Sequence, residues 1–216
     1  MRLITLLLDL LYPPRCAFCR RLLPDGQRGA CRDCLARLPR VPEGGRRHDV
    51  AHTDLCLAPL YYEGAVRESL LRYKFGGLTA YGRVYADFLA KCIDENVISC
   101  DSITWVPLSR KRLRRRGYDQ AELLARELAS ILAIPCERLL VKRIDTPPQS
   151  GTKSAGQRRK NAAGVYACPD AGRVRGKRIV LVDDIVTTGA TLSECARVLK
   201  EAGAAEIIAA AAATRS

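Results

Sequence analysis

The chain has 216 residues, 48% of them hydrophobic, and a formal net charge of +13. This length accommodates one domain of ordinary size with a small addition, and the hydrophobic content is enough for a packed core. No apolar run approaches the roughly 20 residues that a membrane-spanning helix needs, so we expect no membrane span. The excess of basic residues favours a polyanionic partner.

The first twelve residues are mostly apolar but lack the features of an export signal. Asp9 interrupts the apolar run, Pro13 and Pro14 end it, and no small-residue cleavage site follows. We therefore expect a short amphipathic helix that packs on the body of the protein, and a protein that stays in the cytoplasm.

Two Cys-x-x-Cys pairs come next, separated by eleven residues: Cys16 with Cys19, and Cys31 with Cys34. Four thiolates with such spacing suit tetrahedral Zn²⁺, and the short spacer favours a compact zinc ribbon or treble-clef turn. Disulfide pairing is the alternative, but the other six cysteines stand singly in apolar or helical contexts, as reduced thiols do. Because the segment is too short to bury much core, the zinc would have a structural role.

Strands and helices alternate through the rest of the chain. We expect strands over residues 55–62, 102–108, 139–144, 179–182 and 206–214. We expect helices over residues 65–73, 81–95, 120–132 and 192–202. This alternation predicts an α/β fold with a parallel sheet and helices on both faces.

Cationic residues form two groups in the sequence. Six of the seven residues 110–116 are basic, and a second group at Lys153 and 158–160 lies in an expected loop. The first group directly follows the strand predicted at 102–108, and open α/β sheets bind ligands at the carboxyl ends of their strands. Either pyrophosphate or a nucleic-acid backbone would suit these clusters. The candidate contacts to such a polyanion are Arg110, Lys111, Arg116 and Arg158.

Residues 180–191 read Val-Leu-Val-Asp-Asp-Ile-Val-Thr-Thr-Gly-Ala-Thr and are the most informative segment. A buried strand leads to Asp183 and Asp184, which can accept hydrogen bonds from vicinal ribose hydroxyls. The turn and helix that follow present backbone N–H groups and threonine hydroxyls, which favour a phosphate. Together these groups predict a phosphoribosyl site. Its phosphate-binding residues are expected to be Thr187, Thr188, Gly189, Ala190 and Thr191.

This segment resembles the phosphoribosyl-pyrophosphate (PRPP) motif of type I phosphoribosyltransferases. The resemblance implies a catalytic role for Asp183 and Asp184, and Mg²⁺ that binds together with PRPP. It also implies a mobile loop that closes over PRPP, a role that suits the long polar stretch 146–164. The alternative for that stretch is a disordered connector without a role.

The whole chain resembles the ComF competence-protein family, whose members join an N-terminal zinc module to a phosphoribosyltransferase-like domain. The matching segments besides the cysteines are 12–16, 62–64, 74–76, 106–107, 116–120, 146–149, 158–161 and 180–191. Tyr118-Asp119 stands where family members often have Phe-Asn, which adds an acid beside the expected pyrophosphate site. The resemblance implies an N-terminal helix and zinc module over residues 1–50 and a phosphoribosyltransferase-like domain over residues 51–216.

The same resemblance implies a role in natural transformation, in which the protein would act on incoming single-stranded DNA beside a competence helicase or other DNA-processing proteins. Two classes of function remain open from the residues. One is an enzyme that transfers phosphoribose from PRPP to an unknown acceptor. The other is a non-catalytic module that uses the same pocket to bind single-stranded DNA or to sense PRPP.

Overall fold

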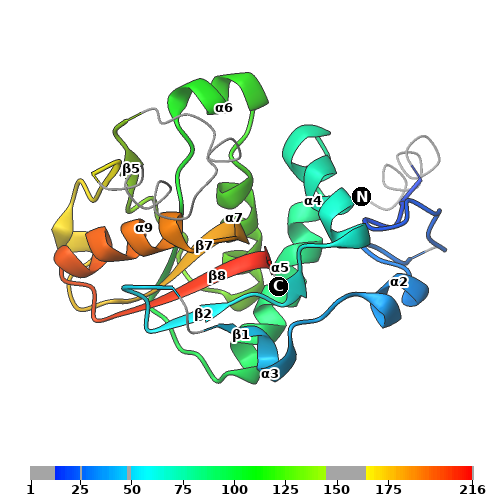
Figure 1. Cartoon of the computed structure of the whole chain (residues 1–216), viewed down its shortest axis with the longest axis horizontal. Helices are drawn as coiled ribbons and strands as arrows, with labels where there is room; N and C mark the ends of the chain where they lie inside the picture. The colour runs from blue at the N-terminus through cyan, green and yellow to red at the C-terminus, as the bar shows by residue number, and fades with distance from the viewer. Residues whose placement is uncertain (1–12, 25, 48–49, 145–163, 216) are drawn as a thin grey trace.

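The structure is a computed structural model that describes residues 13–24, 26–47, 50–144 and 164–215. The helix expected over residues 1–12, the candidate contact Arg158, and all but the last residue of the loop expected over residues 146–164 lie outside these ranges. Figure 1 shows a sheet covered by helices, with the N-terminal cysteine segment at one end of the molecule beside α4.

The central sheet of the described residues has the strand order β1-β2-β8-β7-β4, and β3 also pairs with β8. Only the pairing of β1 with β2 is antiparallel, so the predicted parallel sheet is confirmed. Both central strands are almost continuously buried, as parallel strands covered on two faces must be. The strands are β1 Arg46–Arg47, β2 Leu55–Leu57, β3 Leu60–Tyr61, β4 Ser102–Trp105, β7 Arg178–Val186 and β8 Glu206–Thr214.

Helices cover both faces of this sheet. Successive side chains of β7 point to opposite faces, so that they contribute alternately to two hydrophobic cores. Val180 and Val182 lie in the core formed with α4, α5 and α7, whereas Ile179 and Leu181 lie in the core formed with α9. The helices are α2 Arg32–Arg37, α3 Pro42–Gly45, α4 Gly64–Phe75, α5 Tyr81–Glu95, α7 Gln120–Leu132 and α9 Ala190–Glu201, with a 3-10 turn at Ala171–Arg173. None of the described helices is both long and apolar enough to cross a membrane.

Four predicted strands differ from the structure in their bounds. The strand expected over 102–108 ends at Trp105, and the strand expected over 179–182 is longer, from Arg178 to Val186. The strand expected over 55–62 is interrupted between β2 and β3, where Pro59 has no backbone N–H to donate. The strand expected over 139–144 is reduced to β5 Val141–Lys142, which pairs antiparallel with β6 Tyr166–Ala167 in a separate two-stranded sheet. That strand therefore lies beside the parallel sheet and is not part of it.

The basic run forms a helix, α6 Arg110–Arg116, where the sequence alone suggested none. Ser109 caps its start by accepting a hydrogen bond from the N–H of Arg112, and Gly117 ends it with a φ of 83°. These two caps define the helix even though cations three and four residues apart repel one another.

The N-terminal cysteine segment docks against α4 and α5. The guanidinium of Arg72 on α4 donates hydrogen bonds to the carbonyl oxygens of Ala17 (3.0 Å) and Phe18 (2.9 Å). The ring of Phe18 packs edge-on against Tyr85 and Phe88 of α5. The first Cys-x-x-Cys turn is thus fixed to the last turn of α4, the same turn from which Lys74 reaches Asp184 of β7.

Candidate functional site

A cavity of about 350 Å³ opens at the carboxyl end of β7. The pairing of β4 with β7 ends at Trp105 and Val182, whereas β8 continues beside β7 as far as Val186. The last four residues of β7 are therefore unpaired on one side, and the cavity lies there. This is the position at which open parallel sheets bind ligands.

The phosphate-type cradle is formed by the turn between β7 and α9. Gly189 has a φ of 69°, a conformation that glycine adopts readily, and a β-carbon there would come within 2.9 Å of Val50. α9 begins at the next residue, so its first N–H groups have no partner within the helix and are available to an anion. All five residues predicted for phosphate binding line the cavity: Thr187, Thr188, Gly189, Ala190 and Thr191.

The two predicted acids also line the cavity, but they lie within β7 and do not end it. Because side chains alternate along a strand, Asp184 belongs to the α7 face of the sheet and Asp183 to the α9 face. The carboxylate of Asp184 is 5% exposed, and its Oδ2 accepts hydrogen bonds from Lys74 Nζ and Gln120 Nε2, both at 2.9 Å. Oδ1 of Asp183 accepts the N–H of Asp184 at 2.8 Å. Burial and the neighbouring Asp184 charge raise the pKa of Asp183 well above its usual value.

A hydrogen-bonded network connects these acids to α4 and α7. The side-chain oxygen of Gln120 accepts a hydrogen bond from Arg116, and its backbone carbonyl accepts one from the hydroxyl of Tyr73 at 2.7 Å. The hydroxyl of Tyr118 in turn donates to the carbonyl of Tyr73. The end of α4 and the start of α7 are therefore bonded to each other next to Asp184, which both of them contact.

Asp119 was expected to lie beside the pyrophosphate site, but in the structure it caps α7. It is 7% exposed, and its Oδ1 caps α7 by accepting the N–H groups of Ala121 (3.1 Å) and Glu122 (3.3 Å). Its Oδ2 accepts the N–H of Leu108 at 2.8 Å. Burial outweighs these hydrogen bonds and raises the pKa of Asp119 to about 6. Asp119 is not among the residues that line the cavity, and it connects the loop after β4 to α7.

The structure divides the predicted cationic contacts into two sets. Arg116 lines the cavity and stacks over the ring of Phe75 at 4.8 Å, and burial lowers its pKa. Arg112, one helical turn earlier, lines the cavity as well. Arg110 and Lys111 are exposed and do not line it. The exposure pattern along α6 therefore gives it one face on the cavity and one face on solvent.

Several cavity residues were not predicted from the sequence as site residues. They come from separate parts of the chain, and although some belong to segments that were noted in the sequence, none was given a role in the site. Helical spacing from Arg116 would have indicated Arg112, but no local pattern indicates the others. These unpredicted polar and aromatic residues are Tyr62, Lys74, Arg112, Gln120, Lys142, Tyr166 and Arg215.

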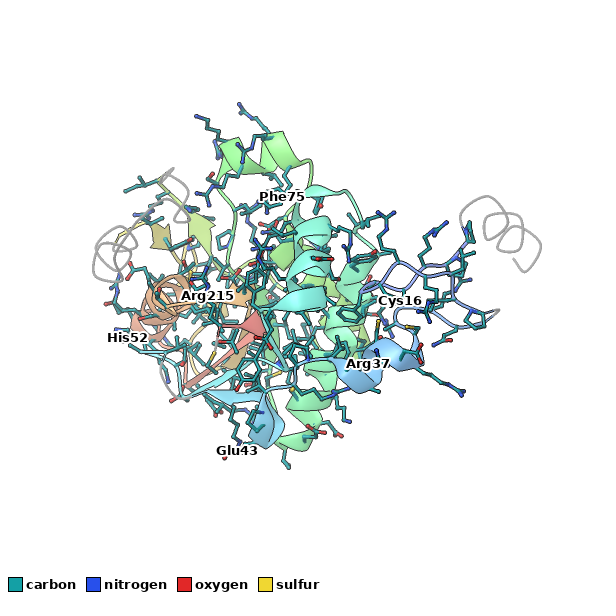
Figure 2. All side chains as sticks on the ribbon, turned by 45° about the vertical axis from the view of Figure 1, so that its right-hand side comes forward. Cys16, Arg37, Glu43, His52, Phe75 and Arg215 are labelled. Atoms are coloured by element: carbon teal, nitrogen blue, oxygen red, sulfur yellow. The ribbon has the colours of Figure 1, made fainter. Side chains whose placement is uncertain are left out.

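The four predicted zinc ligands come together at the opposite side of α4 from the cavity (Figures 1 and 2). Their sulfur atoms all lie within 4.8 Å of one another, and Cys19 and Cys31 are 3.8 Å apart. A tetrahedral zinc with Zn–S bonds of about 2.3 Å requires S–S distances of about 3.8 Å. Burial raises the pKa of Cys16, but backbone N–H groups, chiefly that of Cys31, outweigh this and lower it to about 6, which favours the thiolate at this cysteine. Burial and the neighbouring thiols raise the pKa of Cys34. All ten cysteines are free of disulfides, and the cluster fits a structural zinc.

Two family profiles match the chain. The profile described as "Phosphoribosyl transferase domain" matches residues 118–216, and the profile described as "Double zinc ribbon domain" matches residues 7–46. These matches confirm the predicted fold class, a parallel-sheet phosphoribosyltransferase-like fold with an N-terminal four-cysteine zinc ribbon.

Three characterised proteins are similar in sequence. Competence protein F of Haemophilus influenzae is 28% identical over 214 residues, which cover 89% of this chain and 93% of that protein. Competence protein ComFC of Bacillus subtilis is 29% identical over 197 residues, 88% of this chain and 73% of that protein. DNA utilization protein YhgH of Salmonella typhi is 35% identical over 107 residues, 50% of this chain and 46% of that protein.

Among solved structures, the glutamine phosphoribosylpyrophosphate amidotransferase of B. subtilis has a TM-score of 0.46 and 23% sequence identity. The superposition covers 66% of this chain and 30% of that one.

Proposed function

This chain belongs to the ComF competence-protein family, in which a zinc ribbon accompanies a phosphoribosyltransferase domain, and we propose that its cavity binds PRPP or a closely related phosphoribosyl ligand. The observation that carries the proposal is the combination of a phosphate cradle at the start of α9 with two carboxylates in β7 on the same cavity. We also propose that the ribbon occupies residues 1–50 and the phosphoribosyltransferase-like domain residues 51–216.

Each part of the cavity suits one part of such a ligand. The N–H groups of α9 and the hydroxyls of Thr187, Thr188 and Thr191 would hold the 5-phosphate. Asp183 and Asp184 would accept hydrogen bonds from the ribose hydroxyls. Arg112 and Arg116 would contact the diphosphate, whose oxygens a Mg²⁺ ion would bridge when it binds with the ligand.

The charge of the cavity supports a ligand with more than one phosphate group. Two acidic side chains line it, Asp183 and Asp184, against five cationic ones: Lys74, Arg112, Arg116, Lys142 and Arg215. The cationic excess of three suits an anion that carries phosphates at both ends of a ribose.

The residues present would support a phosphoribosyl transfer without a nucleophilic side chain. Positioning of the ligand and stabilisation of charge at the ribose are the contributions that this site offers. The acceptor in such a transfer is unknown, and a PRPP sensor that does not turn the ligand over would use the same contacts. Turnover is tested by incubating the protein with PRPP and candidate bases and measuring release of diphosphate, and a sensor would release none.

Binding is tested by titration calorimetry of the wild type with PRPP, with ribose 5-phosphate and with inorganic diphosphate. We expect PRPP to bind most tightly because it engages both ends of the cavity. A protein that is folded and zinc-loaded but binds none of the three would contradict the proposal.

A second proposed function, binding of single-stranded DNA, is favoured by the outer face of α6. Four of its cations are exposed, and no ion pair involving them occurs among the described residues: Arg110, Lys111, Arg114 and Arg115. Other exposed cations, such as Arg83 and Lys91, pair with acids on the same helix. Figure 1 shows α6 standing out at one end of the molecule.

The name of the DNA utilization relatives supports the same partner. If phosphate contacts carry the binding, the affinity for an oligothymidylate must fall steeply as salt is added, and an affinity independent of salt would reject this function. We further propose that the protein is cytoplasmic and interacts with a competence helicase or other DNA-processing proteins. Fractionation of cells and co-purification with those proteins test this, and recovery in the exported fraction would contradict it.

A further inference from the structure

Lys74 makes the most enclosed charge contact in the cavity. Its ammonium lies 2.9 Å from Oδ2 of Asp184, and the two side chains are only 19% and 7% exposed. The same carboxylate oxygen accepts the side-chain amide of Gln120 at 2.9 Å. Lys74 belongs to α4, which lies outside the segment matched by the phosphoribosyltransferase profile. No part of the PRPP motif would have indicated it.

The position of Lys74 is fixed from two sides. Tyr73, the preceding residue, donates its hydroxyl to the carbonyl of Gln120, and its own carbonyl accepts the hydroxyl of Tyr118. Two residues before Lys74, Arg72 is bonded to the carbonyls of the first Cys-x-x-Cys turn. The backbone from which Lys74 extends is therefore fixed by the neighbouring contacts, and this places the ammonium within reach of Asp184.

Asp183 and Asp184 are adjacent in the sequence, but their carboxylates do not form a shared binding site for a divalent cation. They lie on opposite faces of β7, and each carboxylate already accepts a hydrogen bond from within the protein. A Mg²⁺ ion requires oxygen ligands at about 2.0–2.1 Å in near-octahedral geometry. The ammonium of Lys74 contacts Oδ2 of Asp184, and both residues line the cavity. Its positive charge also opposes the rise in the pKa of Asp183.

We infer that Lys74 is the built-in counter-cation of the ribose-binding acids and takes the place that a divalent metal ion would otherwise have beside Asp184. This inference rests on the proposed function in one respect, that these acids bind the ribose. Its consequence is that any metal ion in the complex is carried by the phosphates of the ligand and is not held by the acids. Lys74 is then a positioning residue, which keeps Asp184 oriented as an acceptor.

The first experiment measures Mn²⁺ alone by electron paramagnetic resonance on the zinc-loaded full chain. The wild type is expected to show no saturable Mn²⁺ site that depends on Asp184, whereas Lys74→Met should gain one, at least ten times tighter than any wild-type site. The gained site should disappear in Lys74→Met/Asp184→Asn, and Lys74→Arg should behave as the wild type. A wild-type Mn²⁺ site that Asp184→Asn removes would overturn the inference, and so would a folded Lys74→Met without a gained site.

Because Lys74→Met leaves a buried carboxylate unpaired, its fold is checked by thermal unfolding, and Lys74→Gln is the substitute if it fails. If neither lysine variant folds, the wild type and Asp184→Asn still provide a test, because a Mn²⁺ site that is present in the wild type and absent in Asp184→Asn would overturn the inference. Lys91→Met, which removes an exposed lysine of α5, is the matched control and should show no gained site.

The second experiment separates this inference from the proposed function. PRPP is titrated into the wild type and Lys74→Arg with Mg²⁺ and with a chelator at equal ionic strength. The wild-type affinity is expected to change less than tenfold, and a loss of a hundredfold or more without Mg²⁺ would contradict the inference. A wild type that binds no PRPP under either condition would refute the proposed function, while the Mn²⁺ result would still decide what Lys74 does.

Discussion

The cysteine cluster draws its four ligands from residues 16–34, whereas the cavity is lined by side chains that lie between Tyr62 and Arg215 in the sequence. The cluster has little core of its own, because none of the residues in its helix α2 is buried. The cavity instead sits at the edge of a sheet whose strands are buried on both faces. A site built locally needs a metal to stabilise it, and a site assembled from distant segments needs a core to position it.

The two regions meet at α4. Arg72 contacts the carbonyls of the first Cys-x-x-Cys turn, and Lys74, two residues later, contacts Asp184. Each region can therefore be tested separately. Substitutions in the cluster should change zinc binding and the folding of the ribbon, and substitutions around the cavity should change ligand affinity and the stability of the buried polar network.

The largest effect is expected at the cluster. Replacing Cys16 by Ser removes a buried ligand, so zinc content should fall from about one ion per chain to none. Structural zinc sites contribute binding free energies of order 10 kcal/mol, and the ribbon should lose its fold. Elemental analysis and protease resistance of residues 13–45 measure both effects. Cys168→Ser, outside the cluster, is the control and should keep its zinc; equal zinc in both variants would refute a metal site at these cysteines.

The next largest effect is a pH dependence of stability caused by Asp119, the buried acid that joins α7 to the loop before it. The pKa of Asp119 is raised to about 6, above the value of about 3.9 for an unfolded chain. The folded state therefore holds this proton more tightly, so the contribution of Asp119 to stability is greatest below about pH 4 and is lost as the pH rises through 6. The loss amounts to about 3 kcal/mol at most.

Asp119→Asn removes this titration, since the amide stays neutral and its oxygen can still cap α7. Urea unfolding at several pH values between 4 and 7 should show the wild type losing stability relative to the variant as the pH rises. Parallel curves for the two proteins would show that Asp119 ionises normally inside the fold.

A smaller effect is expected for nucleic acid on the solvent face of α6. Replacing Arg110, Lys111, Arg114 and Arg115 by Ala should weaken binding of an oligothymidylate roughly tenfold to a hundredfold and reduce its salt slope by about three. PRPP binding should change little, because these residues do not line the cavity. Fluorescence anisotropy against salt concentration measures both the affinity and the slope.

The matched control removes the same charge from exposed cations that already have acidic partners: Arg21, Arg83, Lys91 and Arg178. If this variant loses as much affinity and slope as the α6 variant, net charge explains the binding and α6 is not its site.

The smallest effect distinguishes two buried tyrosines whose ring centres are 6.2 Å apart. Tyr73→Phe removes the hydroxyl that donates to Gln120 and should cost about 1 kcal/mol. Tyr85→Phe removes a buried hydroxyl that makes no well-formed hydrogen bond in the described part of the chain, although it interacts with the Ser69 hydroxyl, and should be neutral or stabilising. Chemical unfolding of both variants checks this, and equal losses would mean that the Tyr73 contact does not support the cavity.

The difference between the two regions also explains what could be predicted from the sequence. The cysteine cluster and the turn from Thr187 to Thr191 were predicted because their chemistry is contained in a short segment with a recognisable spacing. Three long elements, α5, α7 and β8, have the bounds predicted from local periodicity, whereas β7 is longer than the expected 179–182.

The residues that tertiary structure brings together were not predicted. Lys74 and Lys142 reach the cavity from α4 and from a small separate sheet, and neither has a local signal that connects it with Asp184 or with the α9 turn. Asp119 was expected beside the ligand, but the unpaired N–H groups at the start of α7 draw it into the protein as a cap. Burial and helix capping depend on packing, which spacing alone does not describe.

The central claim, that the cavity at the end of β7 is a phosphoribosyl site, is tested most directly by calorimetric titration of PRPP into the wild type and Asp183→Asn/Asp184→Asn. The wild type should bind, and the variant should bind at least about 100-fold more weakly, because hydrogen bonds to charged groups contribute about 1.5–3 kcal/mol each. A control that replaces two exposed acids, Asp87→Asn/Asp101→Asn, should bind as the wild type does. Equal affinity of the wild type and the Asp183/Asp184 variant would contradict the account.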